Sequence, residues 1–130
     1  MWNCGRPCEY LDKTEGFKRL EEIEDHNVFG YVAMDMRYTE LIVSFRGTNG
    51  LDFKNWITNL NFDQVTYPEV EGAKVHMGWY KAYSRLRDQL LTETEKLFQK
   101  YKPQSIMITG HSLGGALATF AALDLKKYAN

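Results

Sequence analysis

The sequence predicts an α/β fold in which helices cover a sheet that contains parallel strands. Three observations lead to this prediction: two short apolar runs, then a long amphipathic stretch, then a second pair of an apolar run and a helical pattern. A strand–helix–strand–helix order needs crossover connections, and these place strands parallel to one another. At 130 residues the chain has room for one domain.

The two early apolar runs are predicted to be strands. Residues 28–34 (VFGYVAM) and 40–45 (ELIVSF) have strand composition, and a short polar turn around Tyr38 and Thr39 joins them. The second run is almost unbroken in its apolar character, which is typical of a strand covered on both faces. An irregular segment through Tyr67 and Gly72 is expected before the next element.

Two helices with a strand between them complete the predicted order. Residues 78–101 have apolar side chains on one face of a helix that Pro103 ends. The apolar face consists of Trp79, Tyr83, Leu86, Leu90, Leu97 and Tyr101. Residues 105–110 (SIMITG) predict a short buried strand, and residues 113–127 predict a helix that is apolar on nearly every side.

Composition excludes several classes of function. The net charge of -1 comes from interleaved acids and bases, so nothing indicates binding to nucleic acid. No apolar run approaches the roughly 20 residues that span a bilayer, so no transmembrane segment is expected. The first residues lack the apolar stretch of a signal peptide, which leaves a cytosolic protein or one whose leader has been removed.

The two cysteines, Cys4 and Cys8, lie close together in the sequence CGRPC. Two interpretations stay open: free thiols in a terminal segment, or a local disulfide that implies an oxidising compartment. No second pair of Cys or His stands at ligand spacing, so a zinc site is not expected, and no metal or organic cofactor is implied.

Ser112 is the candidate nucleophile. Residues 110–114 (GHSLG) fit the pattern G-x-S-x-G, in which a sharp strand-to-helix turn exposes a serine. The pattern follows a predicted strand and opens a predicted helix, whose first amides would face a developing oxyanion. Gly115 is expected to add tight packing, and an ordinary glycine-rich turn is the alternative interpretation.

Three motifs resemble those of class 3 lipases, the fungal-type triacylglycerol lipases. They are GHSLGGALATFAALDL at residues 110–125, VSFRGTNGLDFKNWITNLNF at 43–62 and AKVHMGWYKAY at 73–83, in the order and spacing of that family. The resemblance covers about residues 28–125. It implies that residues 1–130 form a single partial domain, the N-terminal half of an α/β-hydrolase fold with its nucleophile elbow. The terminal WNCGRPC is similar to the lead-in of secreted members, which implies an extracytoplasmic location.

The resemblance also assigns an oxyanion hole to Thr48 and Leu113. Thr48 would offer its backbone amide and hydroxyl, and Leu113 its backbone amide. Capping of the next helix is the alternative role of Thr48, and the two roles are compatible. Arg46 and Gly47 are expected to shape this loop without touching the substrate.

A lid is implied between Asn49 and Leu60. Its apolar residues follow helical spacing, a pattern that elsewhere usually means a helix packed on a core. By resemblance, this face would cover the acyl site in water and open at a lipid interface. The predicted lid and substrate-binding residues are Phe53, Trp56, Ile57 and Leu60.

The base and acid of the serine are not assigned to any residue of the chain. Such enzymes have the chain order Ser, Asp or Glu, His, and this sequence has no histidine after Ser112. Its one later acid, Asp124, would lie about 18 Å along the same helix. His26, His76 and His111 do not match the position of the family's base. His26 stands in the acidic run EEIEDHN, which indicates solvated surface.

We therefore expect the N-terminal part of a serine ester hydrolase, a lipase acting on acylglycerols through an acyl-enzyme on Ser112. Alone, the chain is expected to be weakly active or inactive. The alternative is a non-catalytic lipase-like module that binds lipid or protein. Because residues 105–110 would form an open apolar edge, we also expect self-association or pairing with a missing C-terminal half.

Overall fold

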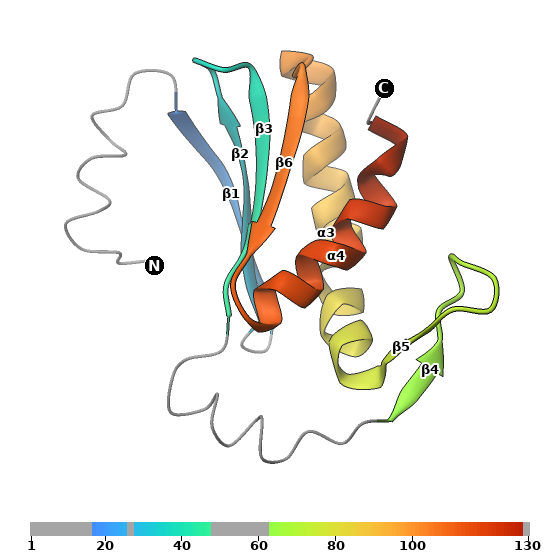
Figure 1. Ribbon diagram of the computed structural model, residues 1–130. Helices are drawn as coiled ribbons and strands as arrows, with labels where there is room; N and C mark the ends of the chain where they lie inside the picture. Colours follow the sequence, from blue (N-terminus) through green and yellow to red (C-terminus); the bar gives the residue numbers. More distant parts are fainter. Residues whose placement is uncertain (1–16, 26–27, 48–62, 129–130) are drawn as a thin grey trace.

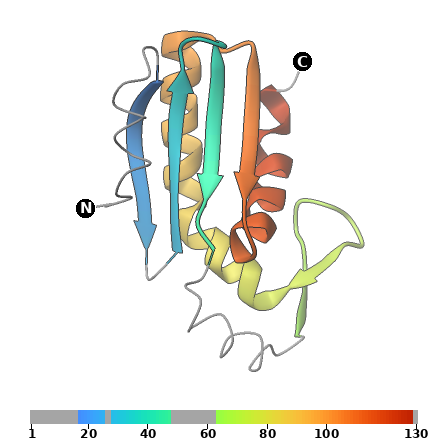
Figure 2. The ribbon, with the colours of Figure 1, turned by 60° about the vertical axis from the view of Figure 1, so that its left-hand side comes forward.

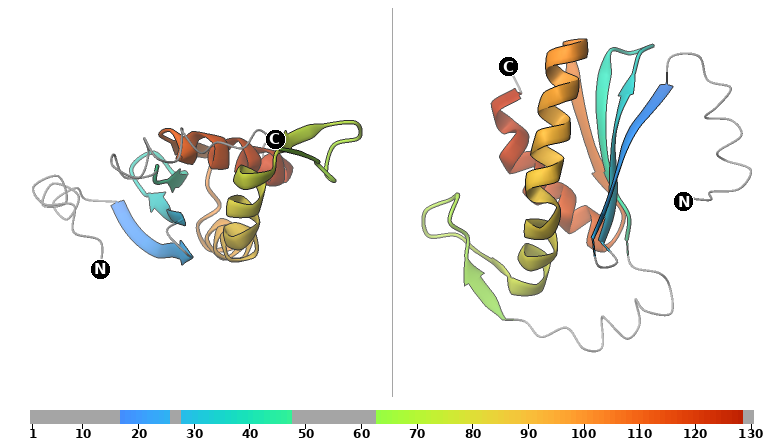
Figure 3. Two further views of the ribbon diagram at one scale, coloured as in Figure 1. Left: turned by 90° about the horizontal axis from the view of Figure 1, so that it is seen from below. Right: turned by 180° about the vertical axis from the view of Figure 1, so that it is seen from behind.

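The computed structural model describes residues 17–25, 28–47 and 63–128, and these form a sheet with two helices on one of its faces (Figure 1). The strands of this sheet are β1 (Phe17–Asp25), β2 (Val28–Asp35), β3 (Glu40–Phe45) and β6 (Ser105–Gly110), in the order β1-β2-β3-β6. Figure 2 shows them side by side, with α3 (Met77–Tyr101) behind β1 and β2 and α4 (Leu113–Leu125) beside β6. Seen from below in Figure 3, both helices lie on the same side of the strands.

The hairpin predicted from the two early apolar runs is confirmed. β2 and β3 pair antiparallel, with Asp35 opposite Glu40 at the turn. The Asp35 carboxylate accepts a hydrogen bond from the backbone amide of Arg37 at 2.8 Å, which is the local contact that favours aspartate before a turn. Thr39 completes the turn with a φ of 53°.

Two features of the sheet differ from the prediction. The sequence was not predicted to form β1, which includes the acidic run before His26 and pairs antiparallel with β2. The sheet is mixed, because only β3 and β6 are parallel. Short turns can join β1 to β2 and β2 to β3 only in antiparallel orientation, whereas the crossover through α3 brings β6 in parallel.

The predicted burial of two strands was wrong. In β3, Leu41, Val43 and Phe45 are buried, and the residues between them are only half-buried, so one face alone lies in the core. β6 was expected to be buried, but its residues alternate between half-buried and exposed. An apolar run alone does not show which of its residues the neighbouring elements of the described chain cover.

The amphipathic helix α3 is confirmed and supplies much of the core. It buries Tyr83, Leu86, Leu90 and Leu97 on the predicted face, together with Thr94. Its C-terminus is closed by Lys102, whose left-handed conformation lets its amide donate to the Phe98 carbonyl at 2.9 Å. Pro103 follows directly, as predicted.

A small hairpin leads into α3. Its strands, β4 (Gln64–Thr66) and β5 (Lys74–His76), lie within the segment predicted to be irregular. Tyr67 follows β4 and is buried, with its ring 5.6 Å from those of Tyr80 and Phe120. This aromatic contact ties the hairpin to both helices.

The last helix is shorter than predicted. α4 ends at Leu125, and residues Lys126–Tyr128 continue as a turn of 3-10 helix, η1. Leu117, Phe120, Ala121 and Leu125 face the core, whereas Ala122 and Leu123 are exposed. The helix therefore has more apolar side chains than the described part of the fold buries.

Candidate active site

Ser112 lies at the turn between β6 and α4, as the sequence predicted. Its backbone has φ 57° and ψ -124°, a combination that side-chain-bearing residues rarely adopt. Lys102 also has a positive φ, but its φ of 47° and ψ of 60° correspond to the ordinary left-handed region. A strained serine at a strand-to-helix turn costs about 1–3 kcal/mol and is typical of functional sites.

Glycines allow the backbone segments around Ser112 to approach one another. A Cβ on Gly110 would lie 2.2 Å from the Gly114 carbonyl oxygen, and a Cβ on Gly114 would lie 2.3 Å from the Phe45 carbonyl oxygen. No real side chain tolerates such distances, so β6, α4 and the end of β3 meet only because both positions are glycine. Gly115 is different, since its Cβ would be 3.4 Å from the Gly110 oxygen. The close packing predicted at Gly115 depends on the glycine opposite it, because a Cβ on Gly110 would lie 2.8 Å from the Gly115 nitrogen.

Among the first amides of α4, that of Leu113 is suited to hold an oxyanion. Gly114 and Gly115 donate to the carbonyls of His111 and Ser112, each at 2.9 Å. Leu113 begins the helix, where amides have no intrahelical acceptor, and its N–H is not engaged by any carbonyl of the described residues. The Ser112 side chain makes no capping hydrogen bond, so its hydroxyl is not used to close the helix.

The end of β3 reaches the same turn. A Cβ on Gly47 would be 2.6 Å from the His111 carbonyl oxygen, so this glycine permits close contact between the two loops. Arg46 donates its amide to Phe29 at 2.8 Å and places its guanidinium 5.1 Å from the centre of the Phe29 ring. Both residues shape the loop, as predicted. Thr48, the predicted oxyanion residue, comes next in sequence and lies outside the described residues.

Comparison with known proteins agrees with this geometry. The sequence matches the family described as lipase (class 3) over residues 42–130, which is more than half of the chain. The chain belongs to the class 3 lipase family.

Curated relatives of this lipase-family chain come from several organisms. It is 36% identical over 122 residues to a lipase of Rhizomucor miehei, a match that covers 91% of this chain and 32% of the relative. It is 39% identical over 97 residues to a secreted mono- and diacylglycerol lipase of Fusarium solani, covering 75% of this chain and 28% of the relative. The chain thus spans about a third of the length of these relatives.

Solved lipase structures share the fold. The structure of Rhizomucor miehei triacylglyceride lipase superposes with a TM-score of 0.79 at 33% identity, over 89% of this chain and 44% of that one. The lipase of Rhizopus microsporus var. chinensis gives a TM-score of 0.84 at 29% identity, over 98% of this chain and 43% of that one. The α/β-hydrolase fold predicted for the lipase-family chain is therefore confirmed.

Several predicted site residues of the lipase chain lie outside the described ranges. They are the oxyanion residue Thr48, the lid and substrate-binding residues Phe53, Trp56, Ile57 and Leu60, the cysteines Cys4 and Cys8, and His26. Within the described ranges, no group of three or more His, Cys, Asp or Glu side chains is placed to hold a metal ion. None of the helices described is long and apolar enough to cross a membrane.

The two described histidines make contacts with the backbone, His76 at the start of α3 and His111 in the turn at Ser112. His76 caps α3, because its Nδ1 accepts hydrogen bonds from the amides of Gly78 at 3.1 Å and Trp79 at 3.3 Å. Its ring also stacks on that of Trp79, with centroids 4.7 Å apart. His111 is exposed beside Ser112, and its carbonyl accepts from Gly114. The sequence pattern did not reveal the capping role of His76, although capping by a residue just before a helix is common.

Asp124 belongs to a structural cluster at the far end of α4. Both of its oxygens accept from Arg87, at 2.8 Å from Nε and 3.0 Å from Nη2, and the Tyr83 hydroxyl donates to it at 2.5 Å. Its side chain is only 5% exposed. Burial raises the pKa of the Asp124 carboxyl, but the hydrogen bonds from Arg87 and Tyr83 outweigh burial and lower it overall. Burial and the same hydrogen bond raise the pKa of Tyr83, so the phenol stays protonated.

The cluster explains why Asp124 cannot serve Ser112. Its carboxylate is fully occupied by two residues of α3, and α4 separates it from the elbow. Arg87 also reaches Glu69 at 3.2 Å, which links the β4–β5 turn to the same cluster. The length of the helix already excluded Asp124 by distance, but the sequence did not predict these partners. The only available signal was the four-residue spacing of Tyr83 and Arg87, which places both on one face of a helix.

Proposed function

We propose that the chain carries the nucleophile part of a serine ester hydrolase that acts on acylglycerols. The observation that carries this proposal is the strained Ser112, held at a strand-to-helix turn by glycines that admit no other residue. Strain of this kind serves no purpose in a surface that only binds, because binding does not require an exposed serine hydroxyl in that conformation. The non-catalytic module is therefore not favoured.

In the proposed reaction, Ser112 Oγ attacks the ester carbonyl and gives its proton to a base. The carbonyl oxygen becomes an oxyanion that the Leu113 amide binds, with Thr48 as the second proposed donor. Collapse of this intermediate breaks the bond to the alcohol, which leaves with a proton, and the acyl group remains on Ser112. Water then hydrolyses the acyl-enzyme and regenerates the serine.

The proposed base and acid come from polypeptide outside these residues. The sequence has no histidine after Ser112, His76 is used as a cap and Asp124 is bound to Arg87 and Tyr83. The chain spans about a third of its curated relatives, and a similar solved structure is described as having a serine protease triad at the catalytic centre of a triacylglycerol lipase. A comparable triad completed around Ser112 is consistent with both facts.

The substrate and location follow from the relatives. Curated relatives are named as secreted mono- and diacylglycerol lipases, and this supports an acylglycerol substrate and an extracytoplasmic location. The predicted lid with Phe53 and Trp56 supports action at a lipid interface, because its apolar residues follow helical spacing. Loss of activation by lipid micelles in a Trp56→Ser variant of the complete enzyme would be the expected sign of this role.

A chimera tests the catalytic proposal directly. Residues 42–130 would replace the matching part of Rhizomucor miehei lipase, and release of fatty acid from an acylglycerol emulsion would be measured. We expect activity that is abolished by Ser112→Ala and retained in a Leu123→Lys control, since Leu123 is exposed on α4. A folded chimera without activity would contradict the proposal.

The isolated chain provides a complementary measurement. With a short-chain chromogenic ester, we expect hydrolysis no faster than that of its Ser112→Ala variant, because the base is missing. Faster hydrolysis that depends on Ser112 would show that a base does reach this serine within the chain or its oligomer.

A further inference from the structure

Asp124 is the one charged residue of α4, and among the described residues its carboxylate gives the helix its one polar side-chain contact with another element. The sequence of α4 is LGGALATFAALDL, and Thr119 is its other residue with a polar side chain. The Thr119 hydroxyl donates to the Gly115 carbonyl at 3.1 Å, within the helix. All other residues of α4 are apolar, so Asp124 is the residue that can give this helix a directional contact.

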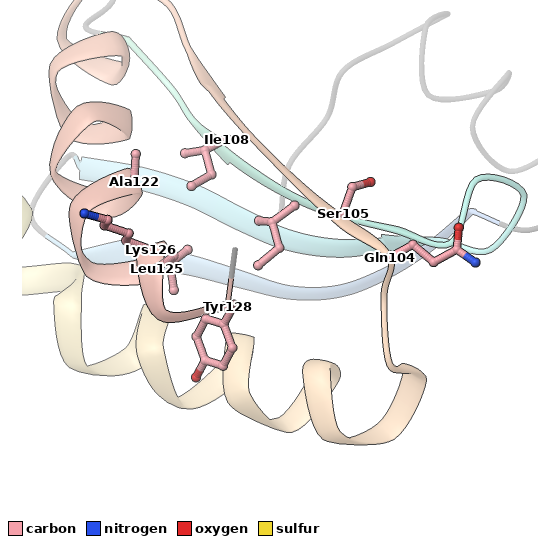
Figure 4. A pocket seen from close by; sticks show the side chains of 8 residues that line it. Gln104, Ser105, Ile108, Ala122, Leu125, Lys126 and Tyr128 are labelled. Carbon is pink, nitrogen blue, oxygen red and sulfur yellow. The ribbon is translucent and has the colours of Figure 1, made fainter. Parts of the chain in front are cut away.

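Apolar contacts hold α4 in the fold without fixing its setting. Hydrophobic burial is non-directional, so it resists removal of a helix more strongly than small rotations about the helix axis or slides along it. Beside β6, a groove of about 380 Å³ includes in its lining Ile106, Ile108, Ala122 and Leu125. Figure 4 shows Ile108 and Ala122 on the two sides of this groove. Since these side chains have no polar atoms, they offer no directional contact across it.

The contacts at the start of α4 restrict the helix from one side only. A Cβ on Gly114 would lie 2.3 Å from the Phe45 carbonyl oxygen, so the two backbones touch and α4 can come no closer to β3. Steric repulsion does not draw the helix back when it moves away. The Ser112 side chain makes no capping hydrogen bond, so it adds no directional contact here.

The end of α4, in contrast, is held from two directions by α3. Arg87 donates to both oxygens of Asp124, at 2.8 Å and 3.0 Å, and the Tyr83 hydroxyl donates to it at 2.5 Å. A guanidinium that shares two hydrogen bonds with a carboxylate fixes its orientation as well as its distance. The best-attested use of buried ionic groups is to set the register between packed elements. We call these three residues the Asp124 cluster.

We propose that the Asp124 cluster sets the rotation and axial position of α4, which makes Asp124 a positioning residue for Ser112. This inference rests on the proposed esterase function, and Asp124 acts through the helix without touching the substrate. Leu113 and Asp124 are 11 positions apart. This separation is about three turns and about 16 Å of rise, so both residues lie on the same side of the helix. A rotation or slide at Asp124 is therefore passed on to the Leu113 amide and to the turn before it.

Small displacements of the nucleophile turn have large effects on catalysis. A misplacement of about 1 Å can lower a rate by up to about 100-fold, even when its cause lies far from the reacting atoms. Substrate binding depends less on the position of one hydroxyl and one amide. We therefore expect loss of the cluster to lower kcat by about tenfold or more and to leave KM within about twofold.

Positioning can be separated from stability at this cluster. Removal of one partner leaves a buried charge and destabilises, whereas replacement of all partners by apolar residues of similar size often leaves stability unchanged or raised. The triple variant Tyr83→Phe, Arg87→Met, Asp124→Leu removes every directional contact of the cluster and keeps its volume. Glu69 loses its partner in this variant, but its side chain is 48% exposed and can be solvated.

The chimera that joins residues 42–130 to the remainder of Rhizomucor miehei lipase contains the whole cluster and is the protein for this experiment. Kinetics with a soluble short-chain ester would give kcat and KM separately, and thermal unfolding would report stability. We expect the triple variant to unfold no earlier than the unmodified chimera, with kcat lowered as above. Thr119→Ala is the matched control, because Thr119 lies nearer to Ser112 on the same helix but bonds only within it. We expect this control to keep its kcat.

Arg87→Lys provides a second measurement that does not require an apolar replacement. Lysine keeps a positive charge beside Asp124, but it replaces the planar two-donor fork by a single ammonium group. We expect kcat to fall by about threefold or more, with KM and the unfolding midpoint nearly unchanged. A purely structural cluster would lower the midpoint and leave kcat of the folded enzyme unaltered.

Three outcomes would overturn the positioning role. The first is an unchanged kcat in a stable triple variant, because Ser112 would then be placed without the cluster. The second is an unchanged kcat in Arg87→Lys, which decides the matter if the triple variant does not fold. The third is an equal loss of kcat in Thr119→Ala, since any change on α4 would then suffice. Inactivity of the folded, unmodified chimera would instead overturn the proposed function, and the positioning role with it.

Discussion

The two ends of α4 have opposite characters. At its N-terminus, Ser112 has a strained backbone, and the surrounding segments touch only because Gly110 and Gly114 lack side chains. At its C-terminus, the Asp124 carboxylate is buried and held by Arg87 and Tyr83. The helix is thus anchored at the end where no chemistry is expected, and this anchor helps to offset the strain at the other end.

The largest expected effect comes from the tightest contact at the elbow. Gly114→Ala would place a Cβ 2.3 Å from the Phe45 carbonyl oxygen, so α4 and β3 would have to separate. We expect the free energy of unfolding to fall by about 3 kcal/mol or more, because neither backbone can move freely. Urea denaturation would measure this loss.

Gly115→Ala is the matched control for that prediction. Its Cβ would be 3.4 Å from the Gly110 oxygen, an ordinary contact, and alanine favours a helix more than glycine does. We expect stability to be unchanged or raised by up to about 1 kcal/mol. Equal destabilisation by both substitutions would show that glycine spacing at the elbow is not specific.

Removal of the anchor at the other end is expected to have a smaller effect. Asp124→Ala leaves the Tyr83 hydroxyl without this acceptor, and among the described acidic residues Arg87 then retains its ion pair with Glu69, at 3.2 Å. Because the Arg87 side chain is 33% exposed and can be partly solvated, we expect a loss of about 2 kcal/mol in urea denaturation. No loss would mean that Asp124 does not anchor α4.

The same anchor predicts a dependence on pH. The pKa of Asp124 lies below its ordinary value of 3.8 in the folded chain, so its ionised form stabilises the fold. This contribution is present above pH 3.8 and is lost as the pH falls through the lower folded pKa. We expect the stability difference between the unmodified chain and Asp124→Asn to shrink below about pH 4. A difference that stays constant down to pH 2 would contradict this account.

The smallest expected effect is a gain in stability. Ser112→Gly would relieve the positive φ of 57°, because glycine adopts this conformation without strain. We expect an increase of about 1 kcal/mol, whereas Ser112→Ala should give none, since alanine retains the strain. Thermal unfolding of the two variants side by side would separate strain from the loss of the hydroxyl.

Elements that depend on local sequence patterns were predicted more completely than contacts between distant segments were. The hairpin, α3 and the Ser112 turn were predicted because spacing and turn residues report local structure. β1 was missed because its acidic residues resemble solvated surface. The exposure of β6 and the partners of Asp124 could not be predicted, because they depend on which segments meet in space. Asp124 is separated from Tyr83 by 41 positions and from Arg87 by 37.

The parallel pairing of β3 with β6 has a consequence for the order of folding. β1, β2 and β3 are neighbours in sequence and can form as local hairpins, whereas Glu40 and Ser105 are 65 positions apart. Closing a long loop costs entropy before its contacts can form, so β6 is expected to join the sheet last. Pulse-labelling hydrogen exchange should then show protection of the β2 amides before those of β6. The strained serine would be assembled in this final step, and until then the uncharged strand stays open to other chains.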